Sequence, residues 1–205
     1  MRIAFTISFL CLFLNGCKSQ KKISTETLEI NKSIKDSFAF AKELVDTTDG
    51  KPLIIDGYTA IVIPERMGNK ELEFNAEKKG FEMPCQCAYK NDTLVVLSAL
   101  AWEGGFAYVS KATKKEAVNS LMMFGKNRKW TLGDREYKDE IEIPSYSDKL
   151  VISKPFPLKL DQLLYGCFEI NSEDFFEVSG DESEKQPQRH VLKIFFSCKV
   201  FPEIL

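Results

Sequence analysis

The sequence predicts an α+β protein that is mainly antiparallel β, a sandwich or a barrel, with an N-terminal helix and one further short helix. Three observations support this fold class. About nine segments have the alternation or the β-branched content of strands. Most of them follow one another in hairpin order, and strands and helices do not alternate as they do in a parallel α/β sheet.

Composition places the chain among ordinary globular proteins. It has 205 residues, of which 44% are hydrophobic and 28% charged, and its formal net charge is −2 at pH 7. These values exclude a disordered chain, a membrane protein with several spans and a strongly basic nucleic-acid-binding protein. We therefore expect no nucleic-acid partner.

The first sixteen residues have the features of an export signal. A positive start is followed by an apolar run over 3–14. As a helix this run would span about 18 Å, too short for a bilayer core of about 30 Å, so it is interpreted as a signal-peptide core. The run leads into Leu14-Asn15-Gly16-Cys17, which resembles the lipobox of bacterial lipoproteins.

That resemblance implies cleavage before Cys17 and a diacylglyceryl group on its sulfur. Residue 18 is Lys, not Asp, and residues 18–25 contain no acid. By resemblance to lipoprotein sorting, the first argues against inner-membrane retention and the second favours a periplasm-facing attachment. We expect an outer-membrane lipoprotein of a Gram-negative envelope, bound to the membrane through its lipid.

Three parts of the chain follow from this interpretation. Residues 1–16 form the signal peptide, 17–31 a lipidated tether and 32–205 a single β-rich domain. No repeat of fixed period is seen, and a chain of this length normally forms one domain.

The domain opens with a predicted helix over 33–45. Ile34, Phe38, Ala41 and Val45 are spaced 4, 3 and 4 residues apart, which places them on one helix face. Gly50 is then positioned as a stop signal.

Strands dominate the rest of the domain. A short helix over 113–124 interrupts the first group, and the turns are rich in Gly, Asn, Asp and Ser. A polar, acidic loop precedes the last strand. The predicted strands are 53–63, 81–89, 93–101, 106–110, 140–143, 150–152, 156–160, a hairpin of 164–170 with 175–178, and 190–201.

Four cysteines fall in the domain: Cys85, Cys87, Cys167 and Cys198. Because an envelope compartment is oxidising, disulfides are expected. Cys85 and Cys87 are two apart on a strand and are poorly placed to pair with each other, so each is expected to bond to either Cys167 or Cys198. Strand alternation points Cys198 toward the core and Cys167 away from it. No C-x-x-C pair is present, and neither a metal site nor a cofactor is expected.

Familiar enzyme signatures are missing from the sequence. His190 is the one histidine and is expected at the surface, next to the polar loop. No G-x-S-x-G or phosphate-binding motif occurs. Acidic clusters at 139–140, 173–174 and 181–184 are expected to be solvated. The chain is therefore expected not to be an enzyme.

Three functional hypotheses remain. The first is an envelope lipoprotein that acts as a non-enzymatic protein-binding or accessory module, with another envelope protein as partner. The second is a binder of small hydrophobic ligands, with a β-barrel cavity lined by aromatics. The third is a carboxylate-dependent envelope hydrolase. The aromatic candidates for the cavity are Phe124, Trp130, Phe156, Phe168, Phe175, Phe176, Phe195 and Phe196.

Overall fold

The computed structural model describes residues 28–45, 58–71, 80–100, 104–125, 128–133, 136–178 and 187–204. The signal peptide, Cys17 and most of the tether expected from the sequence lie outside the described residues, as does the acidic cluster at 181–184. In the part that is described, no helix has the length and apolar character needed to cross a bilayer.

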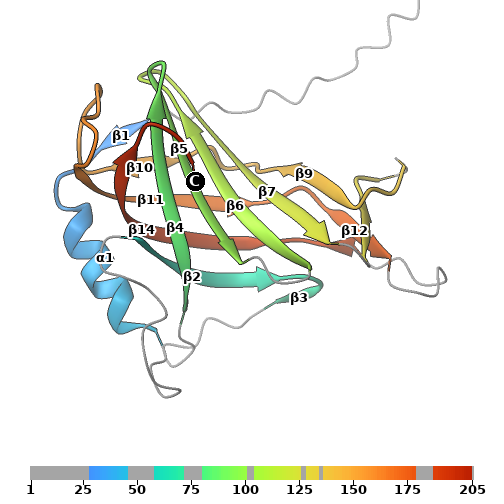
Figure 1. The fold of residues 1–205 in the computed structure, drawn as a ribbon. Coiled ribbons are helices and arrows are strands. Elements are labelled where there is room, and N and C mark those ends of the chain that lie inside the picture. Colours follow the sequence, from blue (N-terminus) through green and yellow to red (C-terminus); the bar gives the residue numbers. More distant parts are fainter. Residues whose placement is uncertain are drawn as a thin grey trace, which may run out of the picture.

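One large, mostly antiparallel sheet forms the domain (Figure 1). A smaller sheet of three short strands lies at one end. The expectation of a mainly antiparallel β fold is confirmed, and the large sheet curls into a half-barrel. In spatial order its strands are β1 (Glu29–Ile30), β10 (Leu150–Ile152), β11 (Leu163–Asn171), β14 (Val191–Phe201), β2 (Tyr58–Met67), β4 (Phe81–Lys90), β5 (Thr93–Leu100), β6 (Gly104–Ala112), β7 (Ala117–Gly125) and β9 (Glu140–Pro144), with β3 (Lys70–Glu71) paired to β2. The small sheet contains β13 (Pro187–Gln188), β12 (Phe175–Val178) and β8 (Lys129–Thr131).

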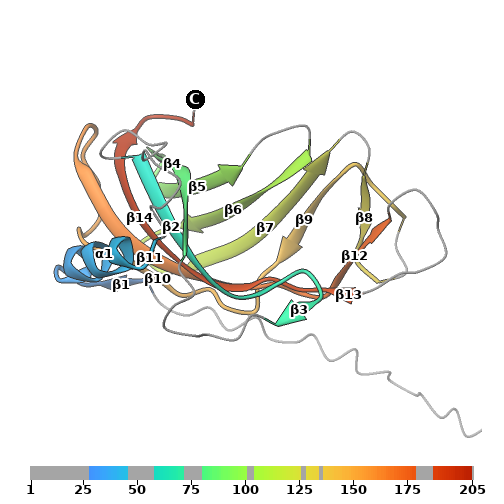
Figure 2. The same ribbon diagram turned by 90° about the horizontal axis from the view of Figure 1, so that it is seen from below.

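The curl brings β7 opposite β11, two strands that are not paired (Figure 2). The side chain of Asn119 in β7 donates a hydrogen bond to the backbone oxygen of Glu169 in β11, at 3.0 Å. An isolated antiparallel bridge joins Ser145 to Ser172 nearby. These contacts hold the two walls of the half-barrel together around the main core.

Strand alternation explains which side chains fill this core. In β11 the side chains of Leu164, Phe168 and Ile170 are buried in the main cluster, whereas Cys167 packs in a second cluster on the outer face. Successive side chains of a strand point to opposite faces, so a strand covered on both sides must be apolar on both.

The last strand of the chain occupies a central place in the sheet. β14 pairs with β11 on one side and with β2 on the other. Beyond the start of β2, β14 also pairs in parallel with β4, with Val200 opposite Cys87. Residues far apart in the sequence are thus neighbours in the middle of the sheet.

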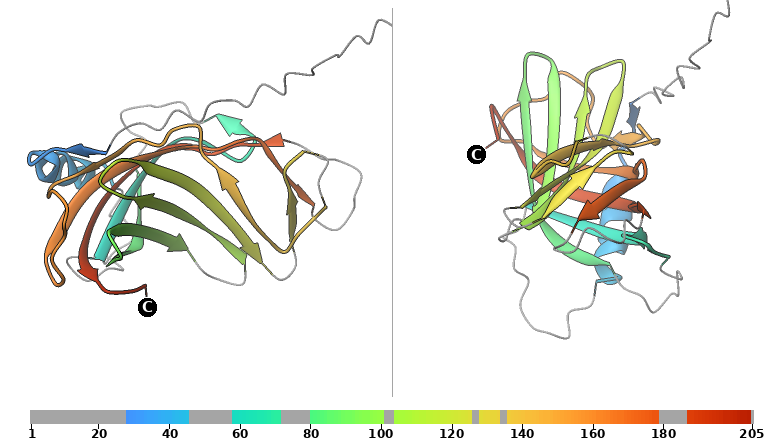
Figure 3. Two further views of the ribbon diagram at one scale, coloured as in Figure 1. Left: turned by 90° about the horizontal axis from the view of Figure 1, so that it is seen from above. Right: turned by 90° about the vertical axis from the view of Figure 1, so that its right-hand side faces the viewer.

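A ten-residue helix, α1 (Ile34–Glu43), covers part of the convex face (Figure 3). It buries Ile34, Phe38 and Ala41. Phe38 and Ala41 pack against Ile61 of β2, and the ring of Phe38 meets Tyr165 of β11 edge-on at 5.5 Å between centroids. The apolar residues at spacings of four and three therefore form the face of the helix that meets the sheet.

The structure contradicts three sequence predictions. The segment 113–124 is not a helix, because residues from Ala117 onward form β7 between β6 and β9. The segment 156–160 is a loop between β10 and β11. β12 does not form a hairpin with β11; it pairs with β8 and β13 in the small sheet. For β7 and β12, pairing with strands distant in sequence decided the outcome over local pattern, whereas 156–160 pairs with no strand although its side chains alternate.

Candidate functional site: the groove beside helix α1

An open groove of about 540 Å³ lies on the convex face where α1 leaves the sheet uncovered. Its apolar lining comes from Ile34, Phe40, Val151, Cys167 and Phe195, and its polar lining from Asp36, Ser37, Lys149, Glu169 and Lys193. The groove thus combines apolar surface with charges of both signs, and it draws on four separate parts of the chain.

Strand register explains the floor of the groove. Val151 of β10 lies opposite Cys167 of β11, and Cys167 lies opposite Phe195 of β14. These three side chains form a row across the convex face, and Ile34 packs against this row at one end of α1. Directly opposed side chains on one sheet face are in contact range, so the row makes a continuous apolar strip.

Charged side chains stand next to this strip. Glu169 and Lys193 are the next opposed pair on this face of β11 and β14. Lys193 Nζ lies 3.3 Å from Glu169 Oε1. Asp36 and Lys149 have no ion-pair partner among the residues that the structure describes. Both charges are therefore available to an occupant of the groove.

Phe40 is the most exposed large apolar residue of the described chain. Its side chain on α1 is 63% exposed at the edge of the groove. Helical spacing accounts for this position, since Phe40 falls two residues from the buried Phe38 and faces away from the helix–sheet contact. The sequence pattern of the helix did not single it out.

Cys167 lies on the groove floor and is buried as a free thiol. Burial raises its pKa to about 12, although the positive charges of Lys193 and Lys149 act in the opposite direction. The thiol is therefore protonated at neutral pH and contributes apolar surface to the floor. It is also unreactive there, since the thiolate is the reactive form.

The four cysteines that the structure describes form one disulfide, between Cys87 and Cys198. The expectation of a disulfide is confirmed, but the second predicted bridge is wrong, because Cys85 and Cys167 are both free. Cys85 packs in the main core and Cys167 on the outer face, so the sheet separates them. Alternation had placed Cys167 and Cys198 on opposite faces, and that is where they lie.

His190 is buried, which corrects the prediction of a surface residue. It is 4% exposed, and its Nδ1 lies 3.2 Å from the hydroxyl of Tyr108. The rings of Phe106 and Phe175 meet its imidazole edge-on, with centroids 5.8 and 5.7 Å away. Tyr108 is 82 residues distant in sequence, and no local pattern points to this contact.

The aromatic residues that were predicted to line a cavity lie in different parts of the structure. Trp130, Phe168, Phe175 and Phe196 are among the largest fully buried side chains and fill the core of the half-barrel. Phe195 faces outward and lines the groove. The apolar groove beside α1 therefore lies on the convex face, outside the core that these rings fill.

A second recess of about 390 Å³ is lined by three acidic side chains, Glu136, Glu140 and Glu142, together with Lys138. Glu140 belongs to one of the clusters that the hydrolase hypothesis invoked. All three glutamates are exposed. Glu142 accepts a hydrogen bond from Ser120 at 2.8 Å and lies 3.6 Å from Lys111 Nζ. Glycoside hydrolysis requires that one of its two catalytic acids be shielded from solvent, and the three glutamates of this recess are not.

Comparison with protein-family models, with curated proteins and with solved structures gives no match.

Proposed function

We propose that this protein is a lipid-anchored, non-enzymatic envelope lipoprotein that binds a segment of another envelope protein in the groove beside α1. The proposal rests on the open groove, with its apolar floor, two charges that have no ion-pair partner among the described residues, and the exposed Phe40 at its edge. Protein interfaces commonly have an apolar centre and a polar rim, with aromatic side chains enriched at the centre.

The charges favour a protein segment over a simple hydrocarbon ligand. Asp36 on α1 and Lys149 before β10 provide one group of each sign, and Glu169 and Lys193 add an ion pair. An occupant that satisfies them must present both a base and an acid around an apolar side chain. An amphipathic peptide segment has this chemistry, and groove binding of such segments is a recurrent mode of recognition.

The anchor part of the proposal rests on Cys17. Ten residues separate Cys17 from residue 28, the first described residue. Eleven links at up to about 3.6 Å each give a reach of about 40 Å, so a lipid on Cys17 would keep the domain close to the outer membrane, on its periplasmic side. Several acyl chains on one residue would make this attachment stable.

Site-specific photo-crosslinking in intact cells tests the groove. A photoreactive residue replaces Phe40 in one strain and Val118 in another. Val118 is 49% exposed on β7 and does not line the groove, so it is a matched control. We expect a protein adduct at position 40 that is absent at 118 and that Lys149→Glu weakens several-fold. No adduct at 40, or equal adducts at both positions, would contradict the proposal; an adduct with lipid alone would favour the ligand-binding hypothesis.

The anchor is tested separately. Cys17→Ser should abolish acylation and release the protein from the membrane fraction, because the sulfur is the attachment atom. Retention of Cys17→Ser in membranes would refute the lipid anchor and leave the groove experiment unaffected.

A further inference from the structure

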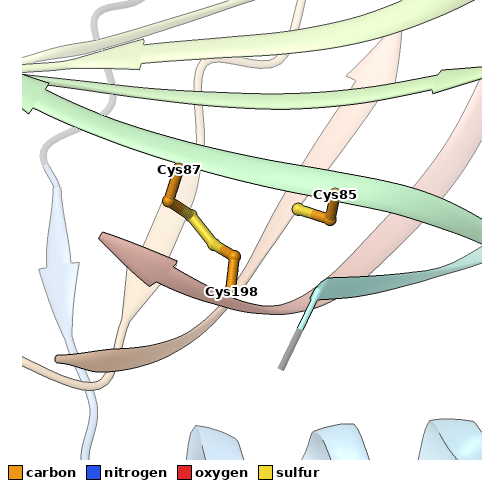
Figure 4. A group of neighbouring side chains, drawn as sticks. All are labelled: Cys85, Cys87 and Cys198. Carbon is orange, nitrogen blue, oxygen red and sulfur yellow. A yellow bond between two sulfur atoms is a disulfide. The ribbon is translucent and has the colours of Figure 1, made fainter. Parts of the chain in front are cut away.

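Three cysteine sulfur atoms lie close together in the main core: the two of the disulfide and that of one free thiol. The Sγ atoms of Cys85, Cys87 and Cys198 all lie within 4.8 Å of one another, and each of the three residues is buried. Cys87 and Cys198 are bonded, and Cys85 is a free thiol. Figure 4 shows the Cys85 sulfur on the same side of β4 as the disulfide.

The sheet topology explains this cluster. Cys85 and Cys87 are two residues apart on β4, so their side chains point to the same face. β2 pairs with β14 as far as Tyr58, opposite Cys198, and from there onward β14 lies directly beside β4. Cys198 thus comes next to two cysteines of β4 at the place where the three strands converge.

We propose that Cys85 and Cys87 are alternative disulfide partners of Cys198, and that the bond can move between them by internal thiol–disulfide exchange. Cys85 loses its proton, and its sulfur attacks Sγ of Cys198. The new bond forms as the bond from Cys198 to Cys87 breaks, and the Cys87 sulfur takes up a proton. One disulfide and one thiol are present before and after the step, so no oxidant or reductant is consumed.

Geometry favours attack on Cys198 over attack on Cys87. A bond between Cys85 and Cys87 would join residues two apart on an extended strand, where the Cα atoms are about 6.6–6.8 Å apart, at the upper limit for a disulfide. Cys198 comes from a different strand, so this limit does not apply to it, and its Sγ lies within 4.8 Å of the Cys85 Sγ. The exchange therefore selects between two bonds that both join β4 to β14.

Burial sets the rate of this exchange. It raises the pKa of the Cys85 thiol well above its usual range, and the thiolate is the nucleophile. In the folded protein at neutral pH the bond to Cys87 is consequently held in place. Alkaline pH, or local opening of β4 from β14, is expected to release it.

The test uses the full chain carrying Cys87→Ala, with Cys85→Ala as the matched control. Peptide mapping without reduction, after free thiols are blocked in denaturant, identifies the linked cysteines. We expect most Cys87→Ala molecules to carry a bond between Cys85 and Cys198. The control should keep the bond between Cys87 and Cys198. A Cys87→Ala protein with Cys85 and Cys198 both blocked as thiols, or with Cys198 bonded to Cys167, would overturn the proposal.

Disulfide exchange in the wild-type protein is a second test, which does not require Cys87→Ala to fold. The wild-type chain is held at alkaline pH in a denaturant concentration below its unfolding midpoint, acidified at intervals and mapped. A measurable fraction bonded through Cys85 should grow with time and reach a plateau, and faster at higher pH. If no Cys85–Cys198 bond forms after incubation long enough for buried thiols to exchange hydrogen with solvent, the alternative-partner proposal is wrong.

Discussion

The imidazole Nδ1 of His190 lies 3.2 Å from the hydroxyl oxygen of Tyr108 inside the half-barrel. Tyr108 belongs to β6 and His190 directly precedes β14, and three aromatic rings surround the imidazole, that of Tyr108 among them. The pair is thus a polar contact among aromatic side chains. Because the imidazole is buried there, the free energy of unfolding depends on pH.

Acidification is predicted to destabilise the fold through His190. Burial lowers its pKa from 6.5 to about 4, so between these values the unfolded chain binds more protons than the folded one. The free energy of unfolding should therefore fall as the pH drops from 6.5 to 4, by about 3 kcal/mol in total. Denaturant unfolding of wild type and His190→Gln across this range measures the effect. Equal pH dependence of the two proteins would contradict it.

Tyr108→Phe should cost about 1–2 kcal/mol of stability. The substitution removes the hydroxyl that faces His190 and leaves a buried ring nitrogen without this partner. Tyr89→Phe is the control, because the Tyr89 hydroxyl bonds Asp92 at 2.8 Å on the exposed surface and its loss should change stability by less than about 0.5 kcal/mol. Chemical denaturation of both variants gives the comparison, and similar losses would count against a special role for the buried pair.

Gly166→Ala is predicted to be strongly destabilising for its size. A Cβ at this position would overlap the ring of Phe196 and the backbone oxygen of Val151. Overpacking of this kind costs about 1–3 kcal/mol. Adding Phe196→Leu to Gly166→Ala should recover part of the loss, since the smaller side chain vacates the contact. Thermal unfolding of the single and double variants tests this, and strictly additive losses would rule out the steric explanation.

Asn119→Ala should loosen the closure of the half-barrel. The side-chain nitrogen of Asn119 lies 3.0–3.1 Å from the backbone oxygens of Ser147, Lys149 and Glu169, and the residue is fully buried. Losing these bonds leaves three partly buried carbonyls without this donor, at about 1–3 kcal/mol. Hydrogen exchange should then accelerate in β10 and β11 more than in β5 and β6. Uniform acceleration across the sheet would show that Asn119 has no local role.

Much of the fold could be predicted from alternation along single strands. In β11 and β14 the two-residue period correctly placed Phe168 and Cys198 in the core and Cys167 on the other face. Where the pattern was compatible with two structures, pairing decided. Ala117, Leu121 and Met122 all favour helices, yet β6 and β9 flank this segment and make it a strand.

The candidate site lay beyond the reach of the sequence because it combines distant segments. Phe40, Val151 and Phe195 belong to α1, β10 and β14, and nothing local in any of them indicates the other two. The same holds for His190: the residues before it in sequence are polar, but the fold places it against Phe106 and Phe175. Burial of a residue near a loop depends on what the rest of the chain brings to it.

The central position of β14 also constrains when the domain can form. Until the last strand has emerged, β2 and β11 have no partner between them, and each presents an open strand edge that invites pairing with other chains. A chain synthesised from its N-terminus therefore cannot complete its sheet until residues 191–201 are available. Truncation before residue 191 would leave both strand edges open and yield an aggregation-prone product. Completion of the sheet therefore requires β14.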